Sequence, residues 1–79
     1  MTRYELPDIL YASLKSMDGS SSIIDVCKYV WKNYHKELQI SGDLFYTWQY
    51  DIRWAATELR KTGRMKSAEI SLRGVWEIS

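Results

Sequence analysis

The stretch that decides the fold is residues 64–79, which read RMKSAEISLRGVWEIS. Two parts of it, 64–70 and 74–79, can each form a short strand, and the SLRG between them supplies a turn. In the second part Trp76 and Ile78 alternate with more polar neighbours, as expected of a strand with one buried face. The sequence therefore predicts a two-stranded β-hairpin at the carboxyl end.

Three helices are predicted upstream of this hairpin, because apolar side chains recur at helical spacing over 7–17, 23–34 and 44–62. Pro7 suits the first position of a helix, and Gly63 can end the third one. This order is typical of a winged helix-turn-helix, although other α+β domains share it. We therefore expect an α+β domain: three helices followed by a two-stranded β-hairpin wing.

Length and continuity indicate a single domain over residues 1–79. No linker, repeat or low-complexity tract divides the chain, and a short strand at 20–22 would complete the small sheet of a winged helix. A chain of 79 residues is too short for a complete nuclease, kinase or dinucleotide-binding domain.

Residue types that support catalysis or metal binding are scarce. With one cysteine (Cys27) and one histidine (His35), neither an internal disulfide nor an ordinary zinc site can form. Cys27 lies on the apolar stripe of the second predicted helix and is expected to be a core residue. Asp43 and Asp51 are expected to be a charge at a helix N-terminus and a surface carboxylate. We therefore expect no enzyme, no catalytic residue, no metal and no cofactor.

The location expected from the sequence is cytoplasmic. No apolar run approaches the 18 or so residues of a membrane span, so no membrane partner is expected. The first residues lack the apolar core of a signal peptide.

The net charge of +1 conceals an asymmetry along the chain. Residues 1–51 carry five basic and seven acidic side chains, whereas residues 52–74 carry six basic and two acidic ones, a net +4. The basic stretch covers the second half of the third predicted helix and the hairpin. In a winged helix these are the elements that meet DNA, with the helix in the major groove and the wing along the backbone.

The third predicted helix has an outward face, and the first hypothesis is that this face contacts double-stranded DNA. At 100° per residue, Tyr46, Tyr50, Arg53, Trp54, Thr57 and Lys61 point away from its apolar stripe. Tyr46, Gln49 and Tyr50, on its leading half, would lie nearest to base edges. The residues expected to contact phosphates are Arg53, Lys61, Arg64, Lys66 and Arg73. The row Lys28, Lys32 and Lys36 on the second helix is either a solvated face or an extension of these phosphate contacts.

A second hypothesis concerns Tyr50 and Trp54, which lie one helical turn apart. Exposed together, they would form an aromatic strip that anchors a homodimer or another protein partner. A third interpretation is purely structural: the hairpin or the first helix folds over Trp54 and buries it.

From Ser41 onward the chain resembles the N-terminal domain of Mrr-type restriction proteins. The residues that carry the resemblance are Ser41-Gly42, Ile52-Arg53-Trp54-Ala55, Leu59-Arg60-Lys61, Gly63 and the closing RGVWEIS of 73–79. The resemblance implies a winged-helix DNA-binding domain, which in Mrr-like proteins precedes a nuclease domain and directs it to DNA. With no room for that nuclease, the chain would be a free-standing version, for instance from a phage or mobile element, or a domain cut from a longer protein.

The chain departs from the family pattern at two places. After the Gly the family commonly has two aliphatic residues, whereas this chain has Arg64 and Met65, which add one positive charge near the wing. Three positions before the Trp the family often has Arg, whereas this chain has Asp51. Phosphate would repel this carboxylate, although it could accept a hydrogen bond from a cytosine amino group.

Overall fold

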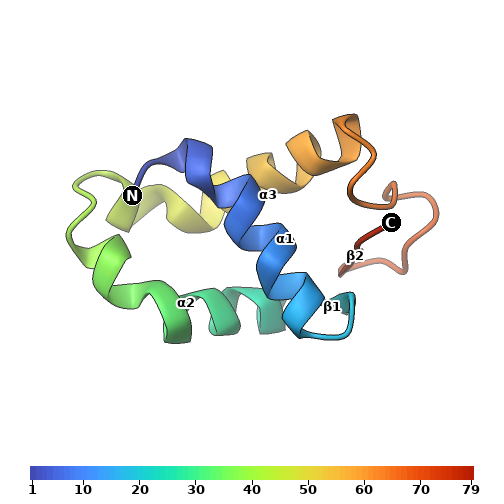
Figure 1. Cartoon of the computed structure of the whole chain (residues 1–79), viewed down its shortest axis with the longest axis horizontal. Helices are drawn as coiled ribbons and strands as arrows, with labels where there is room; N and C mark the ends of the chain where they lie inside the picture. The colour runs from blue at the N-terminus through green and yellow to red at the C-terminus, as the bar shows by residue number, and fades with distance from the viewer.

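The computed structural model describes all 79 residues. Three helices pack together along the long axis of the molecule, and two short strands pair at one end (Figure 1). The chain is thus a small α+β domain. In chain order the elements are a 3-10 turn Arg3–Glu5, α1 Leu6–Ser16, β1 Ser20–Ser22, α2 Ile23–Gln39, α3 Leu44–Lys61 and β2 Val75–Glu77.

The three predicted helices are all present, and two have the expected bounds to within one residue. Pro7 lies in the first turn of α1, where its missing N–H costs nothing. Gly63 follows the end of α3 with a positive φ of 77°, a conformation that glycine adopts without strain. The second helix runs five residues beyond its predicted end at Tyr34, because Leu38, one turn further, is fully buried and continues the apolar stripe.

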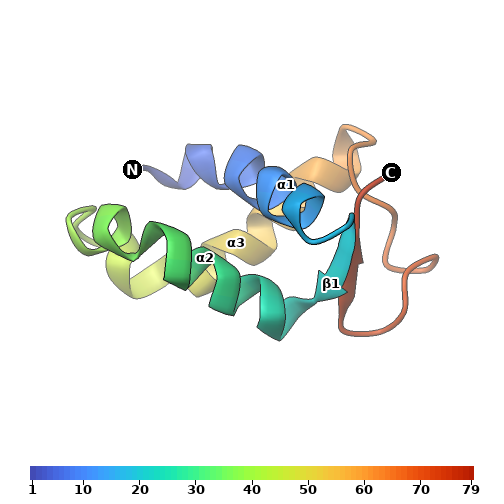
Figure 2. The same ribbon diagram turned by 60° about the horizontal axis from the view of Figure 1, so that its bottom comes forward.

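The sheet is smaller than the predicted hairpin. As expected, a strand forms at Ser20–Ser22, and it pairs antiparallel with β2 at the end of the molecule (Figure 2). The prediction of a strand over 64–70 is wrong, since only Met65 forms a bridge, opposite Ile78. Beyond it the Ser67 carbonyl accepts hydrogen bonds from the N–H groups of Ile70 and Ser71, both at 3.1 Å. A local turn thus satisfies backbone groups that a ladder would otherwise use.

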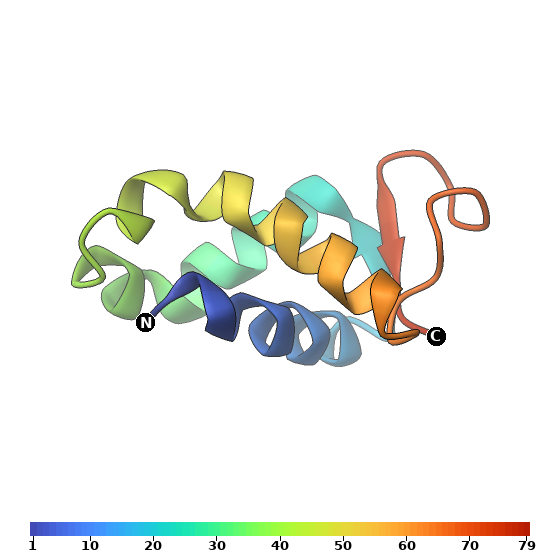
Figure 3. The same cartoon turned by 90° about the horizontal axis from the view of Figure 1, so that it is seen from above.

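The core lies between the helices and is closed at one end by β2. Seen from above, α1 and α3 lie side by side, packed against each other, and draw together toward the strands, and the segment after α3 loops beside the strands (Figure 3). One face of α3 is therefore buried, and the other faces outward. The buried apolar residues are Leu6, Leu10 and Leu14 of α1, Val26, Val30 and Leu38 of α2, Leu44, Trp48, Ile52, Ala55, Ala56 and Leu59 of α3, and Met65 and Trp76 of the closing segment.

Candidate nucleic-acid interface

The outward face of α3 is open to solvent over most of its length. Tyr46 is 83% exposed and Tyr50 is 77% exposed, although both are large aromatic residues. Gln49, Arg53 and Thr57 are exposed as well. These positions share one face because a helix turns by 100° per residue. The α3 face, defined as these five residues, thus combines aromatic, amide, hydroxyl and cationic groups.

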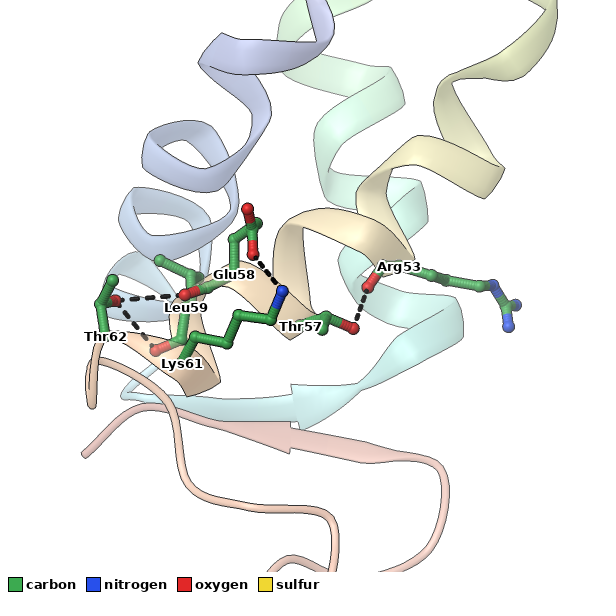
Figure 4. Close-up of polar contacts among 6 residues, drawn as sticks. All are labelled: Arg53, Thr57, Glu58, Leu59, Lys61 and Thr62. Atoms are coloured by element: carbon green, nitrogen blue, oxygen red, sulfur yellow. Dashed lines mark hydrogen bonds and ion pairs between the residues drawn. The ribbon is translucent and has the colours of Figure 1, made fainter.

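Arg53 is the cation at the centre of this face. Its side chain extends away from the helix (Figure 4). Only its backbone carbonyl oxygen accepts a hydrogen bond from a side chain, the Thr57 hydroxyl, at 3.3 Å. No carboxylate of the chain pairs with its guanidinium. The charge of Arg53 is therefore available to a partner.

Lys61, the last residue of α3, forms only one weak contact. Its Nζ lies 3.3 Å from Glu58 Oε2, and its side chain is 70% exposed (Figure 4). Such exposed pairs three residues apart on a helix are weak and are screened by salt. An incoming phosphate can therefore replace Glu58 at little cost.

Arg64 and Lys66 are held by partners in the chain. The Arg64 guanidinium lies 3.2 Å from Asp8 Oδ1 and 4.3 Å from the centre of the Tyr11 ring. Since both residues belong to α1, the Arg64 side chain lies against that helix. Lys66 Nζ lies 3.1 Å from Glu77 Oε2 of β2. These two cations, expected at phosphates, are thus tied to the body of the domain rather than gathered at the α3 face.

Arg73 lies in the segment between Met65 and β2, and its side chain is exposed without an ion-pair partner. Together with Arg60 of the last turn of α3, it lines a cavity of about 500 Å³. Of the five expected phosphate contacts, Arg53 and Arg73 are unpaired, Lys61 is loosely paired, and the other two are engaged.

Trp54 does not extend the exposed aromatic surface. The guanidinium of Arg3 lies 4.1 Å from the centre of its ring, and the Tyr4 ring meets it edge-on at 5.9 Å. The indole is half-buried as a result. Trp54 is thus covered by another part of the chain, but the cover is the N-terminal 3-10 turn and not the hairpin or the predicted first helix. The exposed strip therefore consists of Tyr46 and Tyr50.

The prediction that Asp51 is a surface carboxylate is wrong. Its side chain is only 8% exposed, beside the buried stripe of α3. The Thr47 hydroxyl donates to Asp51 Oδ2 at 2.8 Å, which compensates part of the lost hydration. Asp51 thus presents no negative charge on the α3 face.

A groove lies between the first halves of α2 and α3, and no pattern in the sequence predicts it. This α2–α3 groove has a volume of about 490 Å³. Lys28, Gln49 and Arg53 are its polar lining residues. No single-helix pattern could reveal it, because its two walls come from different helices. The apolar lining consists of Ile23, Ile24, Cys27, Trp31, Phe45 and Trp48.

Cys27, expected in the core, lies partly exposed in this groove. Burial raises the pKa of its thiol, while the positive charge of Arg53 acts in the opposite direction. The raised pKa keeps the thiol protonated near neutral pH, so Cys27 is a poor nucleophile.

His35 packs beside Trp31, with ring centres 5.8 Å apart. No three side chains of His, Cys, Asp or Glu lie close enough together to hold a metal ion. None of the helices is both long and apolar enough to span a membrane.

Comparison of the chain with protein-family models, with curated proteins and with solved structures finds no match.

Proposed function

We propose that this chain is a winged-helix DNA-binding module resembling the N-terminal domain of Mrr-like restriction proteins. In such a domain the third helix enters the major groove of double-stranded DNA. The order helix, strand, helix, helix, strand is one that a winged helix can have, and this supports the proposal. The strand β1 pairs with one edge of β2. At the other edge, the N–H of Lys66 donates to the Glu77 carbonyl oxygen at 2.8 Å. This reduced sheet is compatible with a short wing.

The observation that carries the proposal is the uncovered α3 face. A helix that is buried on one side and open along the other fits the width of the major groove. Gln49 and the hydroxyls of Tyr46 and Tyr50 supply donors and acceptors for base edges, and Arg53 supplies a cation for phosphate. Because Asp51 is withdrawn into the domain, no carboxylate opposes the DNA backbone at this point.

The phosphate contacts number about three rather than five in this proposal. Arg53, Lys61 and Arg73 are free or easily freed, whereas Arg64 and Lys66 would have to leave Asp8 and Glu77. Each neutralised phosphate contributes about −0.9 to the slope of log K against log salt concentration. The expected slope is therefore near −3, compared with about −4 to −5 for five contacts.

The test is a titration of labelled duplex DNA at several salt concentrations. Binding at low salt with a slope near −3 supports the proposal, and absence of binding at low salt overturns it. Arg73→Ala is expected to weaken binding to all sequences about equally, because a backbone contact positions the domain without reading bases.

A protein partner is the alternative, favoured by Tyr46 and Tyr50. Two tyrosines more than three-quarters exposed and one turn apart are a recurrent anchor of protein interfaces. Sedimentation at increasing concentration tests self-association: a dimer that Tyr50→Ala dissociates, in a chain that does not bind DNA, would favour this second function.

A further inference from the structure

The α2–α3 groove has the size and lining of a small-molecule site. Its volume of about 490 Å³ falls within the range of ordinary ligand pockets, roughly 300–1,000 Å³. Six of its nine lining residues are apolar. Such pockets join an apolar wall to a few polar groups that orient the ligand, and the groove has both.

The apolar wall is aromatic and incompletely covered. The rings of Trp31 and Trp48 are nearly parallel, with 10° between their planes and 6.2 Å between their centres. The centre of the Phe45 ring lies 6.1 Å from the centre of the Trp31 ring. Trp31 nevertheless remains 40% exposed, and Ile24 at the rim is 69% exposed. A flat ring placed here would remove apolar surface from water and stack on aromatic neighbours.

The polar lining is positively charged and lacks a counterion. Lys28 comes from α2 and Arg53 from α3, and neither forms an ion pair within the chain. No acidic side chain lines the groove. The charge of Arg53 reaches into the groove, since it lowers the pKa of the Cys27 thiol against the effect of burial. The complementary ligand is therefore an anion.

We infer that the α2–α3 groove binds a small aromatic acid, with its ring against Trp31 and its acidic group between Lys28 and Arg53. A neutral aromatic molecule would leave both cations without a partner, and a purely ionic ligand would leave the aromatic wall exposed. The groove shares Gln49 and Arg53 with the α3 face, but the inference does not rest on DNA binding, because its test contains no DNA.

The probe is 1-anilinonaphthalene-8-sulfonate, an aromatic anion whose fluorescence rises in apolar sites. We expect saturable binding of one molecule per folded chain. The four tryptophans supply an internal control in nitrogen-15 NMR spectra. The indole N–H signals of Trp31 and Trp48, in the groove, should shift on binding, whereas those of Trp54 and Trp76, outside it, should not. Absence of saturable binding, or equal shifts at all four, would overturn the inference.

Two matched comparisons test the role of charge. N-phenyl-1-naphthylamine, which lacks the sulfonate, should bind clearly more weakly than the anionic probe. The double substitution Lys28→Gln and Arg53→Gln should weaken anion binding about tenfold and leave the neutral probe unaffected. Lys32→Gln with Lys36→Gln removes the same charge from exposed positions of α2 outside the groove, and should change anion binding by less than about twofold. Circular dichroism verifies that both double variants are folded; equal effects of the two would refute the site.

Discussion

Two parts of the basic stretch 52–74, α3 and the residues directly after it, differ in what the fold does with their charge. At the α3 end, Arg53 is exposed and unpaired. Directly after α3, Arg64 and Lys66 are tied to carboxylates, and Arg64 also covers the Tyr11 ring. Arg73, further along, is exposed and unpaired again. A paired cation joins parts of the domain, whereas an unpaired one remains available to a partner. The net charge of a segment therefore overestimates the charge that it can offer to DNA.

The largest effect should come from Trp76, the larger of the two core residues in the closing segment. It is 3% exposed, and in the antiparallel sheet it lies opposite Ser21 of β1. Trp76→Ala should lower the free energy of unfolding by about 3–5 kcal/mol, because it leaves a cavity beneath the strands. Urea denaturation followed by circular dichroism measures this.

Tyr50→Ala on the α3 face is the matched control for Trp76→Ala. Since Tyr50 is 77% exposed, its loss should change the free energy of unfolding by less than about 0.5 kcal/mol. If the two substitutions destabilise the domain equally, the division into a structural closing segment and a free α3 face is wrong.

The next effect compares two arginines in DNA binding. Arg53→Gln should reduce the salt slope by about 0.9 and weaken binding to all duplexes, because it removes one phosphate contact. Arg64→Gln should leave the slope nearly unchanged and lower the free energy of unfolding by less than about 1 kcal/mol, since its ion pair with Asp8 is exposed. Salt-dependent titrations of both variants decide between them; an equal loss of slope would show that Arg64 leaves Asp8 on binding.

The fold was largely predictable because its helices obey local rules. The apolar stripes and the residues at helix ends indicated all three helices, and only Leu38, one turn beyond the predicted end of α2, was overlooked. The strand over 64–70 failed for a physical reason. Alternation of side chains does not reveal whether backbone groups find a strand partner, and here the Ser67 carbonyl offers a local turn instead.

Of the candidate site, the α3 face itself was predictable from the sequence. Helical spacing correctly turned Tyr46, Tyr50 and Arg53 outward. It failed at the margins of the buried stripe, where burial depends on neighbouring elements: Asp51 lies inside, and Trp54 is covered by Arg3 and Tyr4 of the N-terminal turn. The α2–α3 groove could not be predicted at all, because it depends on how two helices pack together.

The smallest effect concerns the pH dependence of Cys27. Burial raises the pKa of this thiol, so alkylation by iodoacetamide should reach half its maximal rate at a higher pH than for an unfolded chain. As pH rises through the ordinary thiol range, the unfolded state loses this proton first, and the free energy of unfolding should fall. Arg53→Gln removes the charge that opposes burial and should shift the profile to still higher pH, whereas Arg64→Gln should not move it. Rate measurements between about pH 7 and 10 follow this. Identical shifts in both variants would mean that Arg53 exerts no more influence on the α2–α3 groove than an arginine held on α1.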